Sequence, residues 1–141
     1  MFNYNAEGID VESGFKVATE GEYNIVIRDT QEKTTKVKED GTGGYPMVSV
    51  RCEIDDTGEA LGVSFFHNVT FIPKGQKGAG MALFFLKAIG EPVEGNLEVD
   101  PQRWIGKRFK AKVNVGEYKG KRRNEIAYLI VNEESTDDIP F

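Results

Sequence analysis

The chain has 141 residues, of which 39% are hydrophobic and 29% charged, a composition that fits one soluble domain with polar extensions. The single Cys52 excludes an internal disulfide, and one cysteine with one histidine excludes a structural zinc site, so we expect no metal, no cofactor and a reducing cytoplasm. The net charge is −5, the pattern of a signal peptide is missing, and the longest mostly apolar run, residues 81–89, is too short to span a membrane.

The N-terminal half predicts three β-strands. Residues 1–20 alternate poorly between apolar and polar side chains and predict an extended lead-in, whereas residues 22–29 alternate clearly and predict the first strand. The polar residues 31–44 predict a long loop, which leads to a second strand at residues 46–55. Aromatic and β-branched side chains predict a third strand at residues 62–72.

The C-terminal half predicts one helix and two further strands. Residues 81–89 predict a helix closed by Gly90. Residues 107–115 alternate almost perfectly and predict the fourth strand, a hairpin turn follows at residues 118–121, and residues 124–131 predict the fifth strand. The alternation in the fourth strand points four apolar side chains inward: Phe109, Ala111, Val113 and Val115.

The order of three strands, one helix and two strands predicts an all-β fold, a five-stranded OB-fold barrel with one helix between strands 3 and 4. A plain β-sandwich is the alternative fold. The predicted domain covers residues 21–131, between the lead-in at 1–20 and an acidic interaction tail at 132–141 that has too little apolar content to fold alone. In an OB-fold the ligand usually lies across strands 2 and 3, between the first-to-second and fourth-to-fifth loops.

The net charge is unevenly divided along the chain. Residues 1–22 carry five acids against Lys16, and residues 132–141 carry four acids and no base. The segment between them holds 17 basic and 14 acidic side chains, an excess of three positive charges. Seven bases fall within residues 108–123, around the predicted hairpin. Acidic ends therefore flank a basic middle, which is compatible with a polyanionic ligand.

A protein that binds single-stranded nucleic acid needs cations along the phosphates and flat side chains on which bases stack. Alternating lysines on one strand are usually only its solvated face, so the interpretation depends on the cluster. The candidate nucleic-acid-binding residues come from the first three strands, the first loop, and the fourth strand with its hairpin: Arg28, Lys33, Lys36, Lys38, Tyr45, Arg51, Phe66, Arg108, Lys110, Lys112, Tyr118, Lys119, Lys121, Arg122 and Arg123.

No catalytic arrangement competes with this interpretation, so we expect no enzyme. The only histidine, His67, lies on a predicted strand rich in aromatic residues, so we expect it to have a structural role. Residues 73–80 contain glycines and lysines but lack the ending of a phosphate-binding loop. Trp104 precedes a predicted strand, so we expect it to anchor the core and not to stack on a base. The apolar side chains of the helix are expected to plug the end of the barrel: Leu83, Phe84, Leu86 and Ile89.

The last five residues form the most specific motif of the chain: Asp137, Asp138, Ile139, Pro140 and Phe141. This motif closely resembles the C-terminal tip of bacterial single-stranded DNA-binding proteins, which docks into basic, apolar pockets of partner proteins. The resemblance implies recruitment of replication or repair proteins. The sequence departs from that family in having Thr136 where a further aspartate is common, and in a very short linker.

The body of the chain, residues 15–131, resembles instead the small OB-fold single-stranded DNA-binding proteins of phage replication modules. The matching segments are residues 20–23, 66–70, 85–90, 105–108 and 118–121. This resemblance implies a sequence-nonspecific single-stranded DNA-binding protein of phage replication, recombination or repair. Such a protein acts in the bacterial host cytoplasm and does not bind a membrane. A homo-oligomer is left open.

Two rival functions remain at this point. The first is a protein-interaction or virion structural module with a barrel fold, in which the basic rim is ordinary surface. The second is a nuclease, which the lack of a metal-ligand cluster in the sequence disfavours.

Overall fold

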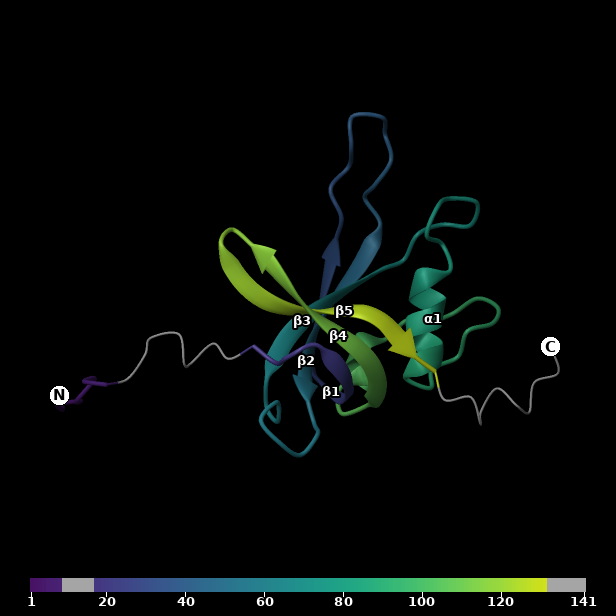
Figure 1. Cartoon of the computed structure of the whole chain (residues 1–141). Helices are drawn as coiled ribbons and strands as arrows, with labels where there is room; N and C mark the ends of the chain where they lie inside the picture. The colour runs from purple at the N-terminus through teal and green to yellow at the C-terminus, as the bar shows by residue number, and fades with distance from the viewer. Residues whose placement is uncertain (9–16, 132–141) are drawn as a thin grey trace.

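The computed structural model describes residues 1–8 and 17–131, and within them one sheet of five antiparallel strands with a short α-helix confirms the all-β prediction (Figure 1). The strand order is β3-β2-β1-β4-β5. The elements are β1 (Gly21–Thr34), β2 (Pro46–Ile54), β3 (Ser64–Thr70), α1 (Met81–Ala88), the 3-10 helix η2 (Pro101–Trp104), β4 (Arg108–Tyr118) and β5 (Lys121–Ile130).

The central strand β1 belongs to two pairings, because its N-terminal part pairs with β4 and its C-terminal part with β2. The two pairings overlap at Ile25 and Val26, and a bulge between Ile27 and Asp29 interrupts the pairing with β2 just beyond the overlap. β1 continues to Thr34, beyond the predicted end, since its backbone pairs with β2 although its side chains there are polar.

The predicted loop at residues 31–44 is wrong in extent, because the backbone pairing of β1 with β2 continues to Thr34. Beyond Thr34 the chain continues as a narrow hairpin, in which Val37 and Gly43 form an isolated bridge and Lys38 N–H donates to the carbonyl of Thr42 at 2.7 Å. The β4–β5 hairpin is likewise longer than predicted. Its turn consists of Lys119 and Gly120 alone, with φ of 52° and 78°, which is the left-handed geometry that two-residue hairpin turns require.

The core lies between the inner face of the sheet, α1 and η2. Trp104 is fully buried, as its predicted role as a core anchor requires, and its ring lies 5.6 Å from that of Phe85 on α1. Leu86 and Ile89 are buried as expected, but Leu83 and Phe84 are exposed by 40% and 46%. The expectation that all four plug the barrel is therefore wrong, because only one side of so short a helix faces the sheet.

Two further features bear on the domain. The buried Asn124 accepts a hydrogen bond from Ala18 N–H and donates one to the Ala18 carbonyl, both at 2.9 Å, so the end of the lead-in is tied to β5. In the described part of the chain, no helix is long and apolar enough to pass through a membrane.

Candidate nucleic-acid interface

The hairpin of β4 and β5, here named the β4–β5 ribbon, has two chemically different faces. Paired residues of antiparallel strands share a face, and successive pairs alternate. The inner face carries Phe109, Ala111 and Val113, which are buried in the core. The opposite, outer face carries five residue pairs: Tyr118 with Lys121, Gly116 with Arg123, Asn114 with Glu125, Lys112 with Tyr128, and Lys110 with Ile130.

The tip of the outer face combines one aromatic ring with three cations. Tyr118 is 53% exposed, the Arg123 guanidinium carbon lies 4.7 Å from its ring centroid, and Lys119 Nζ lies at 5.3 Å. Lys121 is exposed and lies in register beside Tyr118. The stacked cations fix the ring while leaving half of it to solvent. This tip therefore presents an aromatic platform and positive charge within the reach of one nucleotide.

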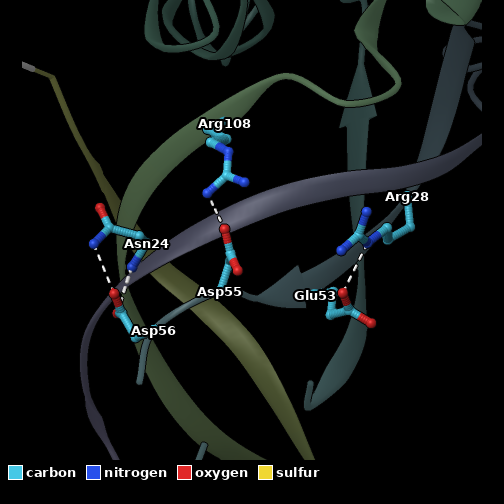
Figure 2. A network of polar contacts seen from close by, with 6 residues as sticks. All are labelled: Asn24, Arg28, Glu53, Asp55, Asp56 and Arg108. Atoms are coloured by element: carbon cyan, nitrogen blue, oxygen red, sulfur yellow. Dashed lines mark hydrogen bonds and ion pairs between the residues drawn. The ribbon is translucent and has the colours of Figure 1, made fainter. Parts of the chain in front are cut away.

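The predicted basic cluster does not lie on one face. Arg122 pairs with Glu117 and belongs to the opposite face of the ribbon from Arg123. Arg108 starts β4, at the far end of the strand from the turn, and its guanidinium forms an ion pair with Asp55 at the end of β2 (Figure 2). Sequence proximity thus overstated the cluster, because strand length separates residues by about 3.3 Å per position.

Two other predicted cations also have carboxylate partners. Arg28 Nε donates to Glu53 at 2.7 Å (Figure 2). Lys112 Nζ lies 3.5 Å from Glu20. A phosphate approaching these cations would compete with carboxylates, whereas the tip cations have no ion pair among the described residues.

A second candidate surface lies on the outer face of β1, β2 and β3. Phe66 is 66% exposed there, while its neighbour Phe65 is buried, so Phe66 is the outward ring of the two. Phe66 pairs with Arg51, and Arg51 pairs with Asp29. This surface therefore has an exposed ring in register with an arginine, as the ribbon tip does, but with the carboxylate of Asp29 on the next strand.

The end of β1 and the segment that joins it to β2 contribute charge but a less accessible ring. Lys33, Lys36 and Lys38 are all exposed. Tyr45 is half-buried and its hydroxyl donates to the Gln76 side-chain carbonyl, so stacking of a base on it would disturb an existing contact.

One exposed aromatic residue was missed from the sequence. Tyr128 is 56% exposed and pairs with Lys112 on the outer face of the ribbon. Strict alternation from the buried Asn124 would point Tyr128 inward, but a register shift between Lys112 and Val113 reverses the phase. Glu125, also missed, lies between the tip and Tyr128 on the same face and supplies the only negative charge among the outer-face pairs of this ribbon.

The reactive side chains His67 and Cys52 do not belong to this surface, since His67 is half-buried and Cys52 fully buried. His67 packs against Phe85 with ring centroids 5.6 Å apart, and burial lowers its pKa to about 4, so the imidazole is neutral at pH 7. Burial raises the pKa of the Cys52 thiol to about 12. Among the residues described, no three histidine, cysteine or acidic side chains are grouped to hold a metal ion. The tail motif, Asp137 to Phe141, lies outside the described residues.

Comparison with known proteins gives no family for the chain. No protein-family model matches it, and no curated protein matches it in sequence.

Proposed function

We propose that this protein binds single-stranded DNA without sequence specificity. The observation that carries the proposal is the ribbon tip, where the exposed ring of Tyr118 has Arg123 and Lys119 close to it. Every base has an aromatic face that can stack on such a ring, and the flanking cations can neutralise phosphates of any sequence. The short α1 packs into the core through Phe85 and offers no long recognition helix for a major groove.

The same proposal includes the closure of the sheet into an OB-fold. β3 and β5 are the two edges of the strand order, and α1 packs against both. An OB-fold places its ligand between the first and last hairpins, and here both hairpins carry exposed lysines or arginines. The exposed Phe66 and Arg51 pair then lies on the strands between them.

The tail motif supports a second part of the proposal, the recruitment of replication or repair proteins. Its resemblance to the bacterial tip and the resemblance of the body to phage proteins together favour a role in phage DNA replication, recombination or repair in the bacterial cytoplasm. Phe141 would supply the apolar anchor and Asp137 and Asp138 the electrostatic steering.

A gel shift with a labelled single-stranded oligonucleotide tests the DNA-binding proposal. We expect a shifted complex with the wild-type protein, and weaker binding by Tyr118→Leu, which removes the ring but keeps the apolar bulk. Leu61→Ala, at an exposed apolar residue outside both candidate surfaces, is the matched control. Absence of any complex at low salt would favour the protein-interaction or virion module, and cleavage of the oligonucleotide with a divalent metal would favour a nuclease.

A further inference from the structure

A groove lies where the two edge strands meet the helix, and we name it the seam groove. It has a volume of about 590 Å³ and lies between β3, β5 and α1. Figure 1 shows the same arrangement, with the end of β5 beside α1. Its apolar walls include the exposed Met81 and Phe84 of α1 and Tyr128 of β5. A groove of this volume is within the range of small-ligand sites.

The seam groove also has polar groups that are free to bind a ligand. His67, Asn68 and Thr70 line it from β3, and Tyr128 adds a hydroxyl. Within residues 1–8 and 17–131, none of these four side chains has a hydrogen-bond partner. The neutral imidazole of His67 offers one donor and one acceptor. Apolar walls with a few free donors and acceptors are typical of small-molecule sites, and a nucleobase has both the apolar faces and the polar edges that such a site takes.

The groove continues the basic outer face of the ribbon. Tyr128 belongs to both, since it pairs with Lys112 on the outer face and lines the groove. Six strand positions separate Lys112 from Tyr118, which corresponds to about 20 Å along β4. A single strand held at the tip would therefore reach the groove within a few nucleotides, with Lys112 and Lys110 beside its phosphates.

We propose that the seam groove binds a nucleobase of the single strand whose backbone follows the outer face of the ribbon. This inference rests on the proposed function and adds a base-binding site away from the outer face of β2 and β3. A nucleobase is favoured over an apolar peptide because two cations lie beside the groove, where a phosphate backbone needs them. Lys110 is exposed and has no ion pair among the described residues, whereas a phosphate at Lys112 would displace Glu20. Two aromatic residues that line the groove offer rings for stacking: Tyr128 from the sheet and Phe84 from the helix.

Photo-crosslinking with 5-iododeoxyuridine tests the groove directly. A set of otherwise identical oligothymidines would carry the modified base at successive positions, and mass spectrometry would identify the crosslinked residue. We expect one register of the set to crosslink to Tyr128, Phe84, Met81 or His67. Crosslinks confined to Phe66 or Tyr118 in every register would overturn the groove as a base-binding site.

Matched variants provide a second measurement. Tyr128→Leu and Phe84→Ala should each weaken oligonucleotide binding about tenfold, in the range of one lost base stack, while Tyr128→Phe, which keeps the ring and loses only the hydroxyl, should weaken it less than Tyr128→Leu does. Leu83→Ala is the control, since Leu83 is an exposed neighbour of Phe84 on α1 outside the groove.

The outcomes separate this inference from the function on which it rests. Wild-type affinity of both Tyr128→Leu and Phe84→Ala, in folded protein, overturns the groove and leaves DNA binding intact. Loss of protein-partner capture by Phe84→Ala with unchanged DNA affinity would assign the groove to a peptide and also overturn the inference. Failure of the wild-type protein to bind any oligonucleotide would instead overturn the proposed function.

Discussion

The outer face of the β4–β5 ribbon predicts a specific change in salt dependence when its tip cations are removed. The variant is the double substitution Lys121→Ala with Arg123→Ala, which removes two exposed positive charges from one face. Each phosphate contact on a single strand contributes about 0.7 to the slope of log affinity against log salt. Loss of two contacts should therefore flatten the slope by about 1.4.

The same number gives the effect over an experimental salt range. When the salt rises from about 50 to about 200 mM, the affinity of both proteins falls, and the factor of this fall should be about sevenfold smaller for the variant than for the wild type. Fluorescence anisotropy of a labelled oligothymidine, titrated at several salt concentrations, measures both slopes. Thermal unfolding should show the variant folded, since both side chains project from a hairpin into solvent.

Arg122→Ala provides the comparison that tests the geometry as well as the charge. Arg122 neighbours both residues in sequence but pairs with Glu117 on the opposite face of the ribbon. Arg122→Ala should flatten the salt slope by less than half of the change that one outer-face substitution, such as Arg123→Ala, produces. Equal reductions for Arg122→Ala and Arg123→Ala, or an unchanged slope in the folded double variant, would refute the assignment of the DNA to the outer face.

Three further predictions follow from single features. Glu125→Gln should strengthen oligonucleotide binding at low salt, because it removes the carboxylate between the tip and Tyr128 on the outer face; weaker binding in the same anisotropy titration would contradict this. Burial lowers the folded-state pKa of His67 to about 4, so only the unfolded chain gains a proton there between about pH 6.5 and 4. Lowering the pH from about 6.5 to about 4 should thus reduce the free energy of unfolding by about 3 kcal/mol through this residue. Urea denaturation of His67→Gln over the same pH range should show a decline that is smaller by this amount. Deletion of residues 137–141 should leave DNA affinity equal or improved while abolishing capture of host or phage replication proteins, as measured by titration and by pull-down; lost DNA binding with retained capture would reverse these roles.

The sequence predicted the fold best where one side of a strand faces the core. Phe109, Ala111 and Val113 were placed inward by alternation and are buried. Prediction failed at the ends of β1 and of the ribbon, where both sides of the strand are polar and only backbone pairing defines the element. Hydrophobic alternation carries no information about such extensions.

The sequence indicated several cations and rings of the candidate site, but not the surface on which they lie. Arg122 and Arg123 look equivalent in sequence, and only strand register separates their faces. The ion pair of Arg108 with Asp55 joins residues far apart in the chain, so local pattern could not indicate it. The position of Tyr128 depends on a bulge, and a bulge reverses the alternation on which the prediction was based.

The central claim is a preference for single strands, and one titration tests it most directly. Purified full-length protein would be titrated into equal lengths of single-stranded DNA, duplex DNA and RNA at one fixed salt concentration. Stacking on Tyr118 requires unpaired bases, so we expect the single strand to bind more tightly than the duplex, with little dependence on base order. Equal affinity for duplex of the same length would contradict the account.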